Sequence, residues 1–156
     1  MAQEKIIFAK PSSAGFCFIV TFEQGGKMYL DDVFFADGAE ELNKLIAENA
    51  ANVEQIRYDC SIFMQDGKNL RALLPDVDIR LYAPKKKLIE RVTAQSEWLN
   101  ENLITDPDYE QVEYVRFIGM TENYMIGDKQ NPTISVDVLS DAANYYRRRL
   151  LYDIKS

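Results

Sequence analysis

Apolar and polar side chains alternate in the middle of the chain, first over residues 56–64 and again over residues 77–81. A period of two is typical of strands that bury one face and leave the other in water. Between the two stretches stands Asp66-Gly67, a dipeptide that tolerates the positive φ angles of a tight turn. The pattern therefore predicts two neighbouring strands joined by a turn, and the rest of the chain is expected to pack against them.

Three further strands are predicted in the first 35 residues. Residues 5–10 form a short apolar run, and residues 16–23 are almost continuously apolar, as in a strand buried on both faces. Gly25 and Gly26 predict a turn, after which residues 27–35 return as the second arm of a hairpin.

Helices are predicted where apolar residues recur every three or four positions. Residues 42–53 follow this pattern, and Asp37 and Glu40 in front of them have the spacing of a capping box. Residues 88–103 repeat the pattern more strongly and predict a second helix.

The last third of the chain is predicted to combine strands with one helix. Alternation over residues 110–126 favours one or two strands, and residues 134–138 favour a short one, with a loop at residues 127–132 between them. A final helix is expected to begin at Ser140. Its inward face would consist of Ala143, Tyr146 and Leu150.

This order of elements predicts an α+β fold: a mostly antiparallel sheet of about 5–7 strands with three helices packed mainly on one face. Consecutive strands without a helix between them favour antiparallel pairing. The length of 156 residues favours one domain over residues 1–156, because each half alone would have a thin core. If the chain were divided into two domains, the loop at residues 104–109 would be the best candidate for the boundary.

The composition excludes several classes of catalytic and metal site, because the sequence contains no histidine. This excludes Ser-His-Asp and Cys-His nucleophile pairs, zinc sites with histidine ligands and a histidine general base. The P-loop, dinucleotide-binding and nucleophile-elbow motifs are absent as well. We assign no catalytic residue and no metal ligand and expect no cofactor. Enzymatic activity is left open, with the balance toward a non-catalytic protein.

The sequence carries no sign of a membrane segment or of secretion. No apolar run approaches the roughly 20 residues of a membrane helix. The first five residues lack the basic patch and apolar core of a signal peptide. Cys17 and Cys60 lack CxxC spacing and are expected to be buried, reduced thiols. These observations predict a cytoplasmic protein.

The net charge of −7 is distributed unevenly. Residues 68–91, the basic segment, contain seven bases and three acids, whereas residues 97–141, the acidic segment, contain ten acids and two bases. Such asymmetry affects the choice of partner and the rate of association rather than the fold.

Lys85, Lys86 and Lys87 stand at the start of the second predicted helix, which Ala83 and Pro84 introduce. Cations are disfavoured there by about 0.3–1 kcal/mol each, because the helix dipole is positive at its N-terminus. Three lysines at this place would attract a phosphate or carboxylate, which is one hypothesis for the run. The alternatives are a solvated surface and an internal contact with the acidic segment. The run from Arg147 to Arg149 carries less information, because cations complement the dipole in the last turns of a helix.

Asp106, Asp108 and Glu110, with Glu113 nearby, supply oxygen ligands of the kind that Mg²⁺ and Ca²⁺ take. The group lacks the glycine and the spacing of an EF-hand loop. It therefore supports only the weaker hypothesis of a metal-dependent hydrolase.

Three functional hypotheses follow from these patterns. The sequence favours a small, non-catalytic interaction or regulatory protein that binds a protein partner through charged surfaces. In its sharper form, the acidic segment imitates the phosphates of nucleic acid and inhibits a nucleic-acid-handling protein. The alternatives are direct nucleic-acid binding through Lys85–Lys87 and Arg147–Arg149, and the hydrolase described above. The predicted partner-binding residues are Lys85, Lys86, Lys87, Arg91, Glu97, Glu101, Asp106, Asp108, Glu110 and Glu113.

Overall fold

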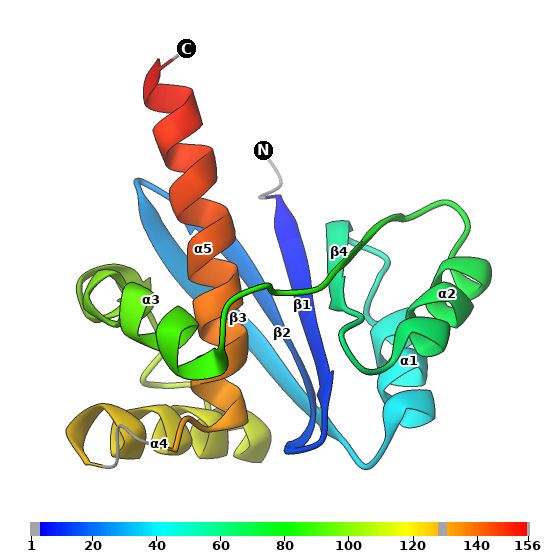
Figure 1. Cartoon of the computed structure of the whole chain (residues 1–156), viewed down its shortest axis with the longest axis horizontal. Helices are drawn as coiled ribbons and strands as arrows, with labels where there is room; N and C mark the ends of the chain where they lie inside the picture. The colour runs from blue at the N-terminus through cyan, green and yellow to red at the C-terminus, as the bar shows by residue number, and fades with distance from the viewer. Residues whose placement is uncertain (1–3, 128–130, 156) are drawn as a thin grey trace.

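Three antiparallel strands, β1 (Lys5–Ser12), β2 (Gly15–Gln24) and β3 (Lys27–Ala36), open the fold (Figure 1). They belong to a computed structural model that describes residues 4–127 and 131–155. The strands predicted for the first third of the chain are confirmed.

The turn and the first helix also follow the sequence pattern. Gly25 and Gly26 take φ angles of 61° and 79°, which glycine adopts without steric cost. Helix α1 (Ala39–Glu48) buries Leu42 and Ile46 completely. Its apolar stripe therefore faces the core as predicted.

The capping box at the start of α1 does not form as predicted. Gly38 is the N-cap residue, and no side chain caps the first turn. The backbone N–H of Asp37 instead donates to Glu41 Oε2 at 3.0 Å, so Glu41 rather than Glu40 reaches back.

The second half of the sheet is parallel. Strand β4 (Val53–Asp59) pairs with β1, and helix α2 (Met64–Leu73) then leads to β5 (Asp78–Tyr82), which pairs with β4. The short strand β6 (Leu103–Ile104) pairs with β3 at the opposite edge. The resulting order in the sheet is β5-β4-β1-β2-β3-β6.

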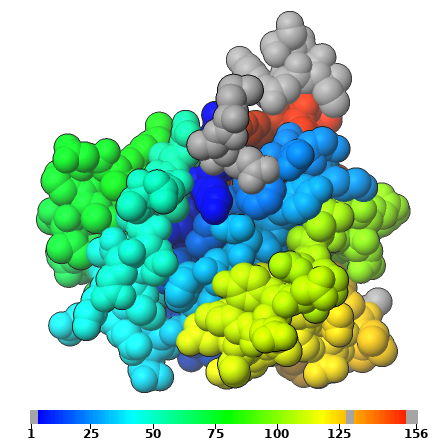
Figure 2. Space-filling view, turned by 180° about the vertical axis from the view of Figure 1, so that it is seen from behind, coloured from blue at the N-terminus to red at the C-terminus, as the bar shows by residue number. Residues whose placement is uncertain are grey.

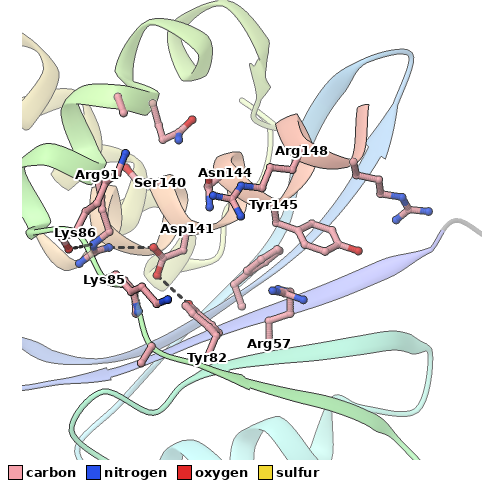
Figure 3. Close-up of a pocket in the computed structure, with 16 residues that line it drawn as sticks. Arg57, Tyr82, Lys85, Lys86, Arg91, Ser140, Asp141, Asn144, Tyr145 and Arg148 are labelled. Atoms are coloured by element: carbon pink, nitrogen blue, oxygen red, sulfur yellow. Dashed lines mark hydrogen bonds and ion pairs between the residues drawn. The ribbon is translucent and has the colours of Figure 1, made fainter. Parts of the chain in front are cut away.

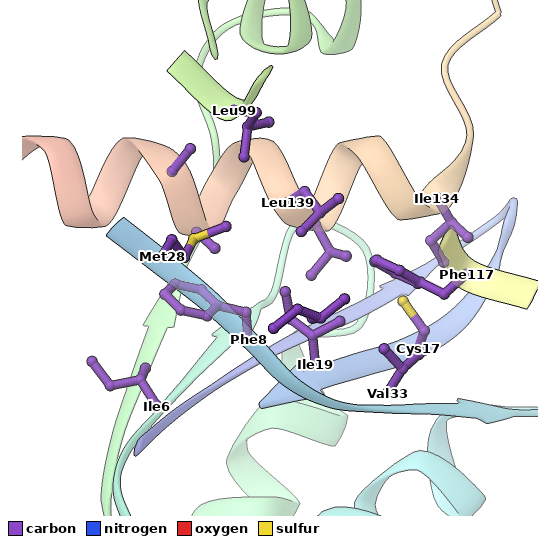
Figure 4. Packing of buried hydrophobic residues seen from close by; sticks show 14 of the residues in the cluster. Ile6, Phe8, Cys17, Ile19, Met28, Val33, Leu99, Phe117, Ile134 and Leu139 are labelled. Carbon is purple, nitrogen blue, oxygen red and sulfur yellow. The ribbon is translucent and has the colours of Figure 1, made fainter. Parts of the chain in front are cut away.

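Helices cover both faces of this sheet. Helices α1 and α2 lie on one side, whereas α3 (Leu88–Asn102), α4 (Val112–Ile126) and α5 (Ile134–Lys155) lie on the other (Figure 1). The larger core lies under α5, where Phe8 and Ile19 of the sheet face Leu139 of the helix (Figure 4). The smaller core joins the opposite face of the sheet to α1 and α2.

The α+β class is confirmed, but two parts of the prediction are wrong. The sheet is mixed rather than mostly antiparallel, because β4, β5 and β6 each pair in parallel with a neighbour. Five helices are present in the described residues instead of three, and they cover both faces. Helix α2 joins the parallel neighbours β4 and β5 as a crossover, and α1 carries the chain from β3 to β4 on the far side of β1.

The central hairpin is also a wrong prediction. Alternation holds through β4 but stops at Asp59, and the residues predicted as its continuation lead into α2. Gly67 belongs to this helix and not to a turn. A Cβ atom there would come within 2.8 Å of Leu81 and 3.2 Å of Tyr58, so the glycine permits close packing of helix against sheet.

Two further predicted strand regions are helical. Residues 112–126 form α4, and its buried residues Tyr114, Phe117 and Tyr124 follow the spacing of a helix. Residues 134–140 are buried all round and form the start of α5, so Ser140 lies inside that helix rather than capping it. Residues 128–130 of the predicted loop lie outside the described residues.

The segment that follows α3 lies against β3, as the view from behind shows in yellow-green beside light blue (Figure 2). The proposed seam at residues 104–109 belongs to this segment, and the single domain stays a prediction. Among the described residues, no helix is long and apolar enough to span a membrane.

Candidate functional site

A cleft of about 870 Å³ opens on the face of the sheet that carries α5 (Figure 3). Helix α5 contacts β1 and β2, and the cleft lies beside it, over β4 and β5. The linker of residues 83–87, which joins β5 to α3, forms its rim.

The periodicity of the elements decides which side chains reach the cleft. In β4, Ile56 and Tyr58 enter the smaller core, so Arg57 and Asp59 point to the opposite face. Tyr82 of β5 lies on the same side as Arg57. One stripe of α5 completes the wall.

The α5 stripe has helical spacing. Asp137 and Asp141 are four residues apart, and both approach Lys10 of β1. Asp141, Asn144, Tyr145 and Arg148 line the cleft (Figure 3).

Beneath the cleft, against Asp141 of its lining, the ammonium of Lys10 lies among three carboxylates, and we call this cluster the floor of the cleft. Its Nζ is 2.5 Å from Asp59 Oδ2 and 3.2 Å from Asp137 Oδ1, and it also donates to Asp141 Oδ2. The side chain of Lys10 is only 2% exposed. Lysine has three N–H donors, so each carboxylate can accept one.

The cluster favours the charged form of Lys10. Burial alone would lower the pKa of Lys10, but the carboxylates of Asp141, Asp137 and Asp59 outweigh it and raise the pKa above its ordinary value. Burial likewise opposes ionisation of Asp59, but the Lys10 ammonium and the hydrogen bonds from Ser61 lower the pKa of that carboxyl. The floor therefore holds an ammonium ion.

Other groups fix the carboxylates independently of Lys10. Arg91 Nη1 donates to Asp137 Oδ1 at 2.7 Å and to Asp141 Oδ1 at 2.9 Å. The hydroxyl of Tyr82 donates to Asp141 Oδ2 at 2.8 Å. Ser61 donates to Asp59 Oδ1 from its hydroxyl at 2.6 Å and from its backbone N–H at 2.9 Å.

The walls and rim of the cleft are basic. Six of its lining residues are lysine or arginine, and one is an aspartate. Arg57 lies 4.6 Å from the ring centre of Tyr145 and 5.8 Å from that of Tyr82. The cationic lining residues are Arg57, Lys85, Lys86, Arg91, Arg148 and Arg149.

The structure brings part of the two predicted cationic runs together. Lys85 and Lys86 come from the linker, and Arg148 and Arg149 come from α5, yet all four line the cleft. Lys87 is the N-cap residue of α3, is exposed and does not line the cleft.

The remaining predicted cations have internal partners. Arg147 Nη1 donates to the Gln95 side chain at 2.9 Å, so this arginine ties α5 to α3. Arg91 lines the cleft but is held by Asp137 and Asp141.

The predicted acidic residues do not form one site. Glu97 and Glu101 are exposed on α3, and Asp106, Asp108 and Glu110 are exposed in the segment before α4. Glu113 Oε2 accepts from the backbone N–H of Phe35. Among the described residues, no group of three His, Cys, Asp or Glu side chains is arranged to hold a metal ion.

Sequence reasoning missed the floor of the cleft, namely Lys10, Asp59, Asp137 and Asp141. One signal was available, because Lys10 interrupts an apolar strand that has no reason to carry a charge. The spacing of Asp137 and Asp141 would also have placed them on one helix face, had residues 134–138 been assigned to a helix.

Comparison with solved structures identifies the fold. The chain is similar to the nuclease domain of the human cytomegalovirus terminase, with a TM-score of 0.58 and 9% identity over 90% of this chain and 83% of that one, in a structure soaked with Mn and bound to an inhibitor. The same domain in a structure described without these additions gives a TM-score of 0.58 and 8% identity over the same shares.

Other comparisons add less. A fowlpox virus resolvase in complex with Holliday junction DNA aligns over 94% of this chain and 99% of that chain, at 8% identity and a TM-score of 0.47. No family model and no curated protein sequence matches the chain. The likeness to the terminase domain shows the fold alone.

These findings overturn the main functional hypothesis. The chain has the fold of a nuclease domain, so a non-catalytic regulatory protein or an inhibitor that imitates nucleic acid is the wrong interpretation. Its physical premise fails as well, because the acidic segment is not one surface: Asp137 and Asp141 are turned inward to Lys10 and Arg91. A protein as the main partner has no support from these comparisons.

Proposed function

We propose that this protein handles nucleic acid and binds its phosphate backbone in the cleft. The observation that carries the proposal is the concentration of cations there: a chain with a net charge of −7 lines this cleft with six lysines and arginines and one aspartate. A cleft lined by charges of one sign focuses the electric field and attracts ligands of the opposite sign, here anions. The fold shared with a viral nuclease domain supports nucleic acid as that ligand.

Three of these cations are available to phosphate. Among the described residues, Lys85, Lys86 and Arg148 form no ion pair, and all three are exposed. Lysine and arginine are the side chains that most often hold phosphate oxygens. They stand on both sides of the cleft, so a strand lying along it can contact the linker and α5 together.

The cleft also offers surfaces for more than a phosphate. Tyr145 stands on the wall beside Arg57 and presents a partly exposed ring, on which a nucleobase can stack. Ser140 lines the same cleft, and its buried hydroxyl has no hydrogen-bond partner among the described residues. A polar ligand would satisfy it.

Fluorescence anisotropy with labelled single-stranded and duplex oligonucleotides tests the proposal. We expect the affinity to fall steeply with salt, because phosphate contacts release counterions. The double variant Lys85→Glu with Lys86→Glu should bind at least about tenfold more weakly and lose roughly two units of the slope of log affinity against log salt. The matched control, Lys44→Glu with Lys68→Glu, makes the same change of net charge at exposed positions in α1 and α2.

The outcomes separate clearly. A loss confined to the cleft variant supports the site. Equal losses in both double variants would reduce the effect to net charge, and absence of binding to either oligonucleotide at low salt would overturn the proposal.

A second candidate is hydrolysis of the bound backbone, and the convergence of Asp59, Asp137 and Asp141 on the cleft floor favours it. Hydrolases use such carboxylates as metal ligands or as general bases. The residues present do not fit a divalent metal ion, because the Lys10 ammonium fills the space between the carboxylates. The form open to this chain is therefore metal-independent: a carboxylate takes a proton from water, and the water oxygen bonds to phosphorus as the bond from phosphorus to the leaving oxygen breaks. The leaving oxygen takes a proton from solvent, and Lys10 and Arg91 supply positive charge.

Incubation of labelled oligonucleotides with and without a chelator tests this candidate. Cleavage that persists in the chelator and disappears in Asp59→Asn would support metal-independent hydrolysis. Cleavage only in the presence of Mn²⁺ or Mg²⁺ would contradict it, and so would intact substrate under both conditions while anisotropy shows binding.

A further inference from the structure

Three carboxylates converge on one point of the cleft floor, and their negative charges favour a cation between them. Asp59 is presented by β4, and Asp137 and Asp141 are presented by successive turns of α5. Carboxylates gathered in this way hold hard divalent ions through their oxygens. In this chain, however, the ammonium of Lys10 lies at their centre.

The oxygens that point to Lys10 are oriented by other partners. Ser61 occupies Oδ1 of Asp59 and leaves Oδ2 for the ammonium. Arg91 occupies Oδ1 of Asp141, whose Oδ2 again faces Lys10. The arrangement of the carboxylates therefore does not depend on Lys10 alone, and it forms a cage preorganised for a positive charge.

We propose that the ammonium of Lys10 is the resident cation of this cluster and excludes divalent metal ions from it. The inference explains how a chain with the fold of a nuclease domain that has been studied with Mn can carry three converging carboxylates without a metal site among its described residues. It does not rest on nucleic-acid binding and can be tested without nucleic acid.

The proposal makes a prediction of a gained function. Lys10→Asp removes one positive charge and adds a negative one at the centre of the cage, and the shorter side chain leaves room for an ion. Two unit changes of charge within about 4 Å of a divalent ion are worth far more than a factor of 100 in affinity, even with the screening typical of a protein surface. We expect the variant to bind one Mn²⁺ at least about 100-fold more tightly than the wild type.

The experiment measures bound Mn²⁺ by electron paramagnetic resonance and by titration calorimetry, and the melting temperature with and without the ion. The melting temperature of Lys10→Asp should rise with Mn²⁺, because a ligand of the native state stabilises it. Lys44→Asp makes the same change of charge in an exposed position of α1 and should gain no site.

Two results would overturn the proposal. One is stoichiometric binding of Mn²⁺ by the wild type that Asp59→Asn abolishes, which does not depend on how well any Lys10 variant folds. The other is a folded Lys10→Asp, with native circular dichroism, whose affinity equals that of the wild type. If Lys10→Asp folds only when Mn²⁺ is present, the proposal is supported, since the metal then replaces the lost ammonium.

Discussion

Lys10 is the residue on which the candidate site depends. It follows Phe8 and Ala9 in a strand that is otherwise buried, and only carboxylates make such a position tolerable. A buried ion pair contributes little net stability against an apolar replacement of all its members, but removal of one partner leaves uncompensated charge. The cluster is thus costly to disturb one residue at a time.

We predict that Lys10→Met destabilises the protein by about 3–5 kcal/mol at neutral pH, because Asp137 and Asp141 then share only Arg91, and Asp59 is left without a cationic partner among the described residues. The same substitution at Lys5, in the same strand, removes a pair with Asp31 at 2.9 Å whose side chains are 37% and 33% exposed. It should cost less than about 1 kcal/mol. Denaturant unfolding of both variants at pH 7 measures the difference, and equal losses would show that Lys10 makes no special contribution.

The loss should depend on pH with a defined sign. Although burial opposes ionisation, Lys10 lowers the pKa of Asp59 below its ordinary value of 3.8 in the wild type. A carboxyl with a lowered pKa stabilises the fold above its unfolded pKa, and this contribution disappears as the pH falls through the folded value. The gap between wild type and Lys10→Met should therefore shrink below about pH 4, as unfolding curves over that range can establish. A gap that widens in acid would contradict this account.

At the scale of elements, several patterns with a clear period predicted the observed structure. The three N-terminal strands, α1 and the stripe of α3 that buries Val92 and Leu99 were all visible in the sequence. The start of α5 was not, because residues 134–140 are buried all round and show no period to distinguish a helix from a strand. In α4 the helical spacing of Tyr114, Phe117 and Tyr124 was present but overlooked beside a short alternation.

The site was predictable only in part for the same reason. Lys85, Lys86 and the arginines of α5 could be found because runs of like charge stand out. The floor could not be assembled, because it needs β4 parallel to β1 and α5 lying across them. The parallel arrangement was not predicted from the sequence, because Asp66-Gly67 was interpreted as a hairpin turn. Gly67 instead permits close packing of α2 against the sheet.

We predict opposite effects for alanine at two helical glycines. At Gly67 in α2, the added Cβ would meet Leu81 at 2.8 Å and the Tyr58 ring at 3.2 Å, so overpacking of about 1–3 kcal/mol should outweigh the gain in helix propensity. At Gly119 in α4 nothing lies within 4 Å of the new atom, and the variant should gain roughly 0.5–1 kcal/mol. Urea unfolding measures the free energy of unfolding of both variants. Equal stabilisation by the two alanines would mean that α2 does not pack this closely on β4 and β5.

At the scale of the molecule, charge is separated rather than mixed. The cleft collects cations from β4, the linker and α5, whereas the exposed acids of α3 and of the segment before α4 lie outside its lining. A polyanion approaching this molecule would be repelled by the net charge of −7 and attracted by the cations of the cleft. The charge distribution therefore orients a polyanion toward the cleft as it approaches. Added salt should weaken both the repulsion by the net charge and the attraction at the cleft.

The charge of the cleft floor should affect how strongly nucleic acid binds between the basic walls. Three bare carboxylates would repel a phosphate backbone, but Lys10 and Arg91 oppose them with charges that belong to the chain itself. A chelator cannot remove these charges, so the affinity of the wild type for an oligonucleotide should be the same in EDTA as in buffer at equal ionic strength. In Lys10→Asp the floor carries two more negative charges, and binding should become weak in EDTA and recover with Mn²⁺. Anisotropy titrations of both proteins in the two conditions test this; a loss of more than about tenfold for the wild type in EDTA would mean that a metal ion, and not Lys10, neutralises the floor.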